Sequence, residues 1–328
     1  MSSVFVTRPV PGNAVERLRE RGHSVTVWPG ELAPPPQALA AALIESDAAL
    51  TMVVDRISPA MLEAAPRLRI VANMAVGYDN IDPMRTAKLG VWVTNTPGVL
   101  AETTADFAWA LLMAAARNVV ASDRDTRAGG WKTWSPTAFL GTDVHAATLG
   151  IVGLGEIGQA VARRAAGFRM RVLYASRSRK PDLEAELGCE CVSLNDVLRE
   201  SDFVSLHTPL NAETRGLIGK RELALMKPSA ILVNTSRGQV VDQDALVDAL
   251  RDRTIAGAAL DVTDPEPLPP SHALFSFSNV IVTPHIASAS LATRARMASM
   301  AADNILAVLE GREPPHAVNR PPAPRGLT

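Results

Sequence analysis

The sequence predicts an α/β protein with two doubly wound parallel sheets covered by helices. Strand-like and helix-like runs alternate along nearly the whole chain, as parallel sheets require when helices carry the crossover connections. The chain has 328 residues, and a single hydrophobic core tends to stop growing near about 250–300 residues, so we expect two domains. A glycine-rich turn at residues 153–158 follows one predicted strand and marks the beginning of the second alternation.

The composition is that of a globular protein without an overall charge bias. Hydrophobic residues make up 47% and charged residues 20% of the chain, which excludes a disordered protein. Because the formal net charge is −1, we expect neither nucleic acid nor a membrane surface as a partner. The longest apolar stretch, residues 107–116, is shorter than the roughly 18 residues of a membrane span, and the first residues lack the features of a signal peptide. We therefore expect a cytoplasmic protein.

In the first third of the chain, predicted strands alternate with short predicted helices. The strands are expected at residues 4–7, 24–28, 49–54, 68–74 and 91–95, and the helices at residues 13–20, 37–45, 59–64 and 83–88. Ser58 before Pro59 and Asp82 before Pro83 are typical N-cap residues followed by proline at the first helical position.

The rest of the chain starts with one long predicted helix. Residues 102–127 form an amphipathic pattern that ends at Gly129 and Gly130. From residue 148 the second alternation begins with strand 149–152, helix 157–166 and strand 171–175, and it continues to strand 281–283. A final helix is expected over residues 288–309, and the proline-rich segment after Gly311 is expected to lie over the surface.

Gly153, Gly155 and Gly158 form the spacing G-x-G-x-x-G between a predicted strand and a predicted helix. In that context the first glycine allows a tight turn, the second lets the main chain approach a pyrophosphate, and the third lets helix and strand pack closely. The N-terminus of the helix offers unpaired N–H groups and partial positive charge to phosphate. The sequence therefore predicts a dinucleotide-binding loop.

The end of the next strand indicates which dinucleotide is bound. An NAD-selective site usually has Asp or Glu about 20 residues after the loop, where it binds the ribose 2′-OH. Here strand 171–175 is followed by Ser176, Arg177 and Ser178, and no carboxylate occurs before Asp182. Hydroxyl and guanidinium groups suit the charged oxygens of a 2′-phosphate. We therefore expect NADP(H), and NAD(H) remains possible if this loop is only a solvated basic turn.

Three further predicted strands end in charged or hydrogen-bonding residues. Arg237 follows the apolar run 230–233, Asp261 and Glu266 follow the run 258–260, and His285 follows the run 280–282. Ligands of open parallel α/β sheets bind outside the carboxyl ends of the strands. If these strands are neighbours of the dinucleotide strand, the four side chains meet beside the nicotinamide.

Arg237, Glu266 and His285 fit the reduction of a ketone by hydride. The negative charge that develops on the carbonyl oxygen must be stabilised and protonated, and an imidazole is the natural proton donor near neutral pH. Glu266 would favour the imidazolium and fix its orientation, and Arg237 could hold a carboxylate and polarise the carbonyl. Each residue alone could equally lie in a salt bridge or a turn, but their common position behind a dinucleotide loop favours a catalytic site. No metal is expected, because Cys189 and Cys191 lack a second pair of zinc ligands.

These motifs resemble those of the D-isomer-specific 2-hydroxyacid dehydrogenases, and within them the glyoxylate/hydroxypyruvate reductases. The resemblance lies in residues 76–82, 95–98, 153–158, 234–238, 266–267 and 283–285, and it extends from Val4 to about Asn319. It implies a flavodoxin-like substrate domain, residues 1–98 plus 289–328, and a Rossmann cofactor domain, residues 99–288, with the active site in the cleft between them. One departure is Ala146-Ala147, where relatives usually have Gly-Lys.

The resemblance also assigns roles to residues. It makes Arg237, Glu266 and His285 the catalytic trio, and it gives substrate binding to Arg237, His285 and the main-chain N–H groups of Val76 and Gly77. Asp261 would hydrogen-bond the nicotinamide amide. The residues expected to contact the cofactor are Thr104, Gly153, Leu154, Gly155, Glu156, Ile157, Gly158, Ser176, Arg177, Ser178, His207, Thr208, Pro209, Thr235, Ser236, Asp261 and Ala287.

The implied activity is the NADPH-dependent reduction of small 2-oxo acids, glyoxylate and hydroxypyruvate first. A 2-ketogluconate reductase or another D-2-hydroxyacid dehydrogenase is the nearest alternative. A protein of another class, an NAD(P)-sensing binding protein like the corepressors built on this fold, would retain the same trio. The segment 130–134 resembles one that some relatives insert toward a partner subunit, which implies a homodimer, although Trp134 could instead pack within its own chain.

Overall fold

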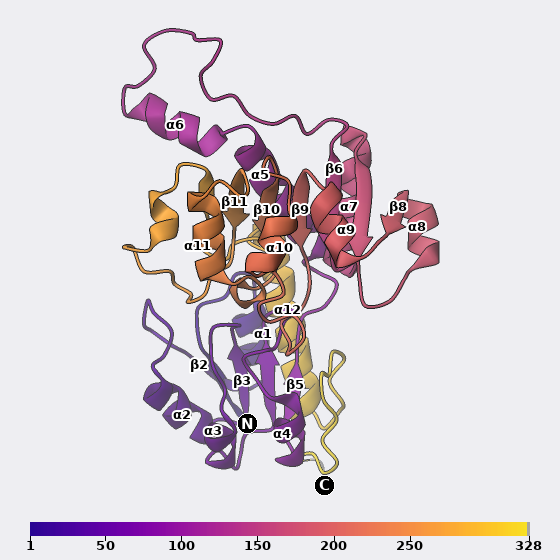
Figure 1. Ribbon diagram of the computed structural model, residues 1–328. Helices are drawn as coiled ribbons and strands as arrows, with labels where there is room; N and C mark the ends of the chain where they lie inside the picture. The colour runs from indigo at the N-terminus through magenta and orange to yellow at the C-terminus, as the bar shows by residue number, and fades with distance from the viewer. Residues whose placement is uncertain (327–328) are drawn as a thin grey trace. The chain divides into compact units, whose positions relative to one another are not determined.

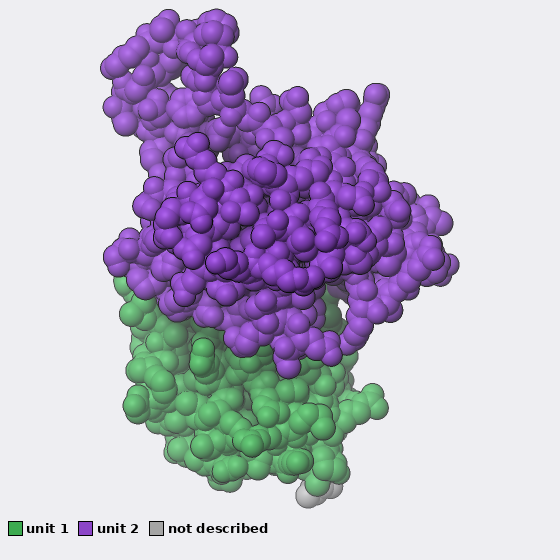
Figure 2. All heavy atoms as spheres, in the orientation of Figure 1, with its two compact units in different colours: residues 1–100, 289–328 green, residues 101–288 purple. Residues whose placement is uncertain are grey.

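The computed structural model describes residues 1–326 and confirms the α/β class with two parallel sheets (Figure 1). The chain forms two compact units, shown in different colours in Figure 2: unit 1 comprises Met1–Leu100 and Ala289–Thr328, and unit 2 comprises Ala101–Ser288. The sequence placed the first boundary at residue 98, and residues 327 and 328 of the predicted first domain lie outside the described residues. None of the helices within residues 1–326 is long and apolar enough to cross a membrane.

Unit 1 contains a five-stranded parallel sheet with the order β2-β1-β3-β4-β5, which is the strand order of flavodoxin. Helices α1 and α12 pack together on the sheet, and α2, α3 and α4 follow one another along it. The elements are β1 (Ser3–Val6), α1 (Ala14–Glu20), β2 (Ser24–Val27), α2 (Pro36–Ile44), β3 (Ala48–Thr51), α3 (Pro59–Glu63), β4 (Ile70–Asn73), α4 (Pro83–Lys88), β5 (Trp92–Thr94) and α12 (Leu291–Leu309).

The predicted N-caps of unit 1 are confirmed. The Ser58 side chain accepts a hydrogen bond from the N–H of Met61, and the Asp82 side chain accepts bonds from Met84 and Arg85. These bonds satisfy N–H groups that the first turn of a helix leaves unpaired, so α3 and α4 begin where the sequence predicted.

Unit 2 contains a seven-stranded parallel sheet with the order β12-β11-β10-β9-β6-β7-β8. One hydrophobic core lies between the sheet and α5 with α7, and the other lies between the sheet and α9, α10 and α11. The elements are α5 (Ala101–Ala116), α6 (Val119–Arg127), β6 (Thr148–Val152), α7 (Glu156–Ala165), η1 (Ala166–Phe168), β7 (Arg171–Ala175), α8 (Pro181–Leu187), β8 (Cys189–Cys191), α9 (Leu194–Glu200), β9 (Phe203–Leu206), α10 (Lys220–Leu225), β10 (Ile231–Asn234), η2 (Gly238–Val240), α11 (Gln243–Arg251), β11 (Gly257–Leu260), η3 (Ala273–Ser276) and β12 (Val280–Val282).

The prediction of one helix over residues 102–127 is wrong. The chain breaks at Asn118, which adopts a left-handed conformation with φ of 53°, and α5 and α6 lie on either side of it. Asparagine tolerates this conformation better than most residues, and its side chain donates a hydrogen bond of 3.0 Å to the carbonyl of Leu140. As a result α6 and the segment that follows it extend away from the sheet of unit 2 (Figure 1).

Candidate active site

The carboxyl edge of the unit 2 sheet carries most of the predicted site residues. The chain runs outward from β6 to β7 and β8, and it then returns to the other side of β6 with β9. The order of connection therefore reverses between β6 and β9, which is where open α/β sheets leave a crevice for a ligand. The glycine-rich loop follows β6 at this point.

Each of the three glycines in the loop meets a different physical requirement. Gly153 has φ of +97°, and a Cβ there would lie 2.9 Å from main-chain atoms of His207. A Cβ on Gly158 would lie 2.2 Å from the carbonyl oxygen of Gly153, so this glycine lets α7 pack against the loop. By contrast, a Cβ on Gly155 would meet no heavy atom of the described residues within 4 Å. The chain itself needs glycine at the first and third positions, and the open space at Gly155 suits a ligand that approaches the main chain.

The first turn of α7 faces this open space without a side-chain cap. Gly155 is the N-cap residue, and no side chain of the described part of the chain caps the helix. Glu156, whose carboxylate would repel phosphate if it faced inward, is exposed to solvent. The N-terminus of α7 thus keeps unpaired donors and partial positive charge, which suit a pyrophosphate.

Buried polar atoms without partners gather at the neighbouring strand ends. His207 Nδ1 and Thr208 Oγ1 follow β9, and Thr235 Oγ1 follows β10. All three atoms are buried, and none has a hydrogen-bond partner among residues 1–326. His207 Nε2 lies 2.8 Å from Ser205 Oγ, and burial lowers the pKa of His207 to about 4, so the imidazole is neutral near pH 7. Because buried polar groups normally have partners, these atoms fit a dinucleotide bound at this edge of the sheet.

The charged side chains of the basic loop after β7 differ in their partners. Ser176 is half-buried, and Arg177 and Ser178 are exposed. The neighbouring Arg179 pairs with Glu184 at 2.8 Å, whereas Lys180 Nζ donates to the carbonyl oxygen of Leu154, inside the glycine loop, at 2.7 Å. Within residues 1–326, Arg177 forms no ion pair, and its guanidinium stays available to an anion. Lys180 is a functional candidate that the sequence analysis missed.

His285 and Glu266 form the central pair of the site. His285 Nδ1 lies 3.0 Å from Glu266 Oε2, and the other oxygen of Glu266 accepts the N–H of Thr263 at 3.0 Å. Each of the paired side chains keeps 29% of its surface exposed. Since a carboxylate only accepts hydrogen bonds, Nδ1 of His285 carries the proton that it donates to Glu266. None of the described residues bonds Nε2, which is therefore the nitrogen available to a substrate.

Asp261 holds the segment that carries His285. Its carboxylate is 1% exposed, and it accepts bonds from the Thr283 hydroxyl at 2.6 Å and from the N–H groups of Ile286 and Ala287 at 2.9 and 2.7 Å. Burial raises the pKa of Asp261, and these three donors act in the opposite direction. His285 has φ of +55°, and its N–H donates to the carbonyl of Asp261 at 2.9 Å. Asp261 therefore stabilises a left-handed histidine, and its predicted bond to the nicotinamide amide stays a prediction.

Arg237 lies in a loop that Asn234 organises. The Asn234 amide donates to the carbonyl of Arg237 at 2.8 Å, and its oxygen accepts the N–H of Ser236 at 2.9 Å. A Cβ on Gly238 would lie 2.0 Å from the carbonyl oxygen of Thr263, so only glycine lets this loop touch the segment that leads to Glu266. The structure thus brings the Arg237 loop next to the Glu266 loop, and Asn234 is a second residue whose role the sequence analysis missed.

The remaining predicted residues lie in both units. Thr104 is buried in the first turn of α5, and Ala287 is buried beside Asp261. Val76 and Gly77 follow β4 of unit 1 and are half-buried, and among the described residues none accepts a hydrogen bond from their N–H groups. Their predicted contact with the substrate stays a prediction.

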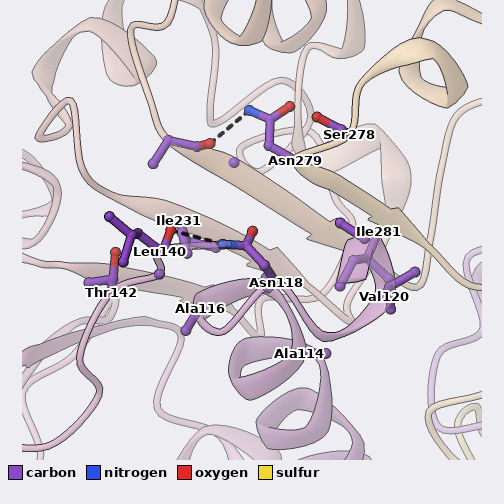
Figure 3. A pocket seen from close by; sticks show the side chains of 15 residues that line it. Ala114, Ala116, Asn118, Val120, Leu140, Thr142, Ile231, Ser278, Asn279 and Ile281 are labelled. Carbon is purple, nitrogen blue, oxygen red and sulfur yellow. Dashed lines mark hydrogen bonds between the residues drawn. The ribbon is translucent and has the colours of Figure 1, made fainter. Parts of the chain in front are cut away.

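A separate hollow lies at the opposite edge of the unit 2 sheet and contains none of the predicted site residues (Figure 3). It encloses about 140 Å³ next to Ile231 and Gly257, the first residues of β10 and β11. Asn118 and Asn279 line it, and the side-chain amide of each donates a hydrogen bond to a main-chain carbonyl. Within residues 1–326, no cluster of three or more His, Cys, Asp or Glu side chains could hold a metal ion.

Comparison with known proteins identifies close relatives. Residues 109–287 match the family described as D-isomer specific 2-hydroxyacid dehydrogenase, NAD binding domain. The chain is 53% identical to the glyoxylate reductase of Korarchaeum cryptofilum over 97% of its own length and 96% of the relative. A crystal structure from Thermus thermophilus has a TM-score of 0.91 and 49% identity, covering 96% of this chain and 99% of that one. The NADPH-dependent glyoxylate/hydroxypyruvate reductase of Sinorhizobium meliloti has a TM-score of 0.85 and 32% identity, covering 99% and 100%.

Proposed function

Because the chain belongs to the family of D-isomer specific 2-hydroxyacid dehydrogenases, we propose that it reduces glyoxylate and hydroxypyruvate to 2-hydroxy acids with NADPH. The observation that carries this proposal is the pair formed by His285 Nδ1 and Glu266 Oε2 at 3.0 Å, on the same sheet edge as the glycine loop. The reductases of Korarchaeum cryptofilum and Sinorhizobium meliloti support the substrate class by their names and their full-length similarity.

In this proposal His285 is the general acid. The Glu266 carboxylate accepts the proton on Nδ1, so the proton that His285 donates is carried on Nε2. When the carbonyl carbon of the 2-oxo acid gains a hydride, the carbonyl oxygen takes the proton from Nε2 and becomes the hydroxyl group. His285 is left neutral, and it regains a proton from water before the next turnover.

Arg237 and the main chain of unit 1 hold the substrate in the same proposal. The Arg237 guanidinium donates to the Ser236 carbonyl at 2.9 Å, which fixes one end of its planar fork. We propose that this guanidinium, with its five N–H donors, binds the substrate carboxylate and polarises the adjacent carbonyl. The unpaired N–H groups of Val76 and Gly77 add neutral donors to the carboxylate.

The nicotinamide dinucleotide supplies the hydride when it is bound. We propose that Gly155 and the first turn of α7 hold its pyrophosphate, and that His207, Thr208 and Thr235 give their unpaired polar atoms to it. The preference for NADPH is supported by Arg177, which has no ion-pair partner among the described residues, and by the absence of a carboxylate at the end of β7.

The proposal is tested by following the oxidation of NADPH and NADH with purified full-length protein against glyoxylate, hydroxypyruvate and 2-ketogluconate. We expect turnover of the two smaller acids, and a higher kcat/KM with NADPH than with NADH. Turnover of 2-ketogluconate alone would identify the protein as a 2-ketogluconate reductase instead. Tight NADPH binding without turnover of any acid would favour an NAD(P)-sensing binding protein. A His285→Ala variant should lose turnover and keep NADPH binding, since the ring bonds Glu266, which is not among the residues proposed to hold the cofactor.

We also propose that the chain forms a homodimer through α6 and the segment that follows it. Val119, Trp131, Trp134 and Leu140 expose between 53% and 79% of their surfaces, so Trp134 does not pack within its own chain. Such a concentration of exposed large apolar side chains is typical of a protein interface. Light scattering coupled to size-exclusion chromatography should give a dimer for the wild type and a shift toward monomer for Trp134→Ser with Leu140→Ser, and a monomeric wild type would refute the proposal.

A further inference from the structure

The Glu266 loop runs from Thr263 to Pro267 and is largely exposed. Asp264, Pro265 and Pro267 are all open to solvent. Inside the loop, Thr263 donates its hydroxyl to the carbonyl of Pro265 at 2.8 Å and its N–H to Glu266 Oε1 at 3.0 Å. Because these residues are not buried in a core, hydrogen bonds rather than packing must fix the main chain that leads to Glu266.

The side chain of Gln243 bonds the main chain of this loop at two points. Its nitrogen donates to the carbonyl of Asp264 at 2.7 Å, and its oxygen accepts the N–H of Asp264 at 3.0 Å. The N–H belongs to the peptide group before Asp264, and the carbonyl belongs to the peptide group after it. Because each peptide group is planar, the two bonds together, called the Gln243 clamp below, fix the main chain on both sides of Asp264.

Gln243 is itself held by the helix that it begins. It is the first residue of α11, and the side chain of Asp242 caps this helix by accepting the N–H of Ala245 at 3.0 Å. Leu246 and Leu250 of the same helix are buried in the core of unit 2. The Gln243 clamp therefore connects an exposed loop to a helix that is anchored in the core, as a precisely placed functional group requires.

The position of the Glu266 loop matters because Glu266 orients His285. The carboxylate of Glu266 bonds Nδ1 of His285 at 3.0 Å, and this bond fixes the rotation of the imidazole ring and therefore the direction of Nε2. Proton transfer requires the donor at hydrogen-bond distance from its acceptor, and a displacement of about 1 Å can lower a rate roughly a hundredfold. A loop that was free to move would let the carboxylate leave the ring.

We propose that Gln243 is a positioning residue, whose two bonds to Asp264 hold the Glu266 loop where Glu266 orients His285. This inference rests on the proposed function and deepens it, because it gives a role to a residue that the sequence motifs do not include. Gln243 contacts neither substrate nor cofactor in this proposal and acts only through Glu266. Its loss should slow the proton-transfer step and leave the binding of ligands unchanged.

The test replaces Gln243 by methionine, which has a similar length and can form neither bond. We expect the single-turnover rate of NADPH oxidation at saturating glyoxylate to fall about ten- to a hundredfold, as for a misplaced general acid. The Kd for NADPH and the inhibition constant of oxalate should each change less than about threefold. Gln243→Glu keeps the acceptor for the N–H of Asp264 and loses the donor to its carbonyl, so its rate should lie between those of the wild type and Gln243→Met.

Gln239→Met is the matched control. Gln239 also donates its side-chain amide to Asp264, but to the side-chain oxygen Oδ1, at 3.0 Å. Its replacement removes a bond to the same residue and leaves both bonds of the Gln243 clamp in place. Gln239→Met should keep the wild-type rate, and a loss as large as that of Gln243→Met would refute the role of the main-chain bonds.

A double-mutant cycle separates positioning from a purely structural effect. In a protein that already carries Glu266→Gln, adding Gln243→Met should lower the rate by less than about threefold, because no carboxylate is left to position. If the two losses multiply instead, Gln243 does not act through Glu266 and the inference is wrong. Should Gln243→Met fail to fold, Gln243→Glu takes its place in the cycle.

The Gln243 clamp can also be tested without turnover. If the wild type reduces no 2-oxo acid, the proposed function fails, but NMR of full-length protein with isotope-labelled histidine still observes the proton on Nδ1 of His285, whose signal His285→Ala identifies. The bond to Glu266 slows the exchange of this proton with water, so the signal should weaken in Gln243→Met and persist in Gln239→Met. An unchanged signal in Gln243→Met would refute the clamp, whatever reaction the protein catalyses.

Discussion

Replacing Gly155 by alanine should remove tight cofactor binding while leaving the fold intact. A Cβ at this position meets no heavy atom within 4 Å in the part of the chain that the structure describes, and Gly155 has φ of −78°, which alanine adopts without strain. Alanine reduces the freedom of the unfolded chain, which stabilises by about 0.4–1 kcal/mol, but it is a poorer N-cap than glycine. These terms offset each other, so the Tm should move by less than about 4 °C.

The cost of the same change to binding is much larger. The new methyl group would stand in the open space in front of the first turn of α7, where a pyrophosphate approaches the main chain. A displaced pyrophosphate loses at least one charge-assisted hydrogen bond, worth about 1.5–3 kcal/mol. That loss corresponds to a Kd for NADPH about ten- to a hundredfold higher.

Gly158→Ala in the same loop gives the opposite result. A Cβ there would lie 2.2 Å from the carbonyl oxygen of Gly153, so α7 must move and the protein should lose about 1–3 kcal/mol of stability. Differential scanning fluorimetry measures the Tm of both variants, and titration with NADPH by fluorescence measures binding. Wild-type NADPH affinity in Gly155→Ala would refute the assignment of this loop, and a wild-type Tm in Gly158→Ala would refute the packing argument.

Three further predictions concern charge and backbone conformation. Arg177→Ser should raise the Kd for NADPH about tenfold or more and leave the Kd for NADH nearly unchanged. Lys180→Met should weaken the binding of both cofactors alike, because Lys180 bonds the glycine loop at Leu154. Equal effects of Arg177→Ser on the two Kd values would contradict the selectivity argument. Burial lowers the pKa of His207 from 6.5 to about 4, so the unfolded chain binds a proton that the folded chain does not, and stability should fall by up to about 3 kcal/mol as the pH drops through that range. His207→Gln should flatten this dependence in urea unfolding, and an unchanged slope would show that another group causes it. Ala146 has φ of +60°, so Ala146→Gly should raise the free energy of unfolding by about 0.5–1 kcal/mol, and a loss of stability would show that the alanine side chain contributes packing.

The sequence predicted the site residues that lie at strand ends, and it missed the features that depend on which side chains bond to each other. The glycine loop and the positions of Arg237, Glu266 and His285 follow from apolar runs that end in polar residues, and parallel sheets bring such ends to one edge. The break at Asn118 could not be read from periodicity, because residues 102–127 continue the amphipathic pattern across it and only the bond to a residue far along the chain reveals the turn. Lys180 stands in an ordinary basic run, and nothing in its spacing indicates that it reaches back to the glycine loop.

In both units a buried polar residue at the end of a strand holds the loop that follows it. Where a parallel strand leaves the sheet, its main chain loses the partners that neighbouring strands supply, and the loop that follows would move freely. In this protein a buried polar residue at that point ties down the loop: Asn73 at the end of β4, Asn234 at the end of β10 and Asp261 directly after β11, each 1% exposed or less. Burying an amide or a carboxylate is costly unless its bonds are made, and in each case the bonds are made to the loop that carries a proposed functional group. These buried hydrogen bonds are therefore kept only in the observed loop conformation. This explains how short loops without regular structure can hold the proposed donors and acids in fixed positions before a substrate binds.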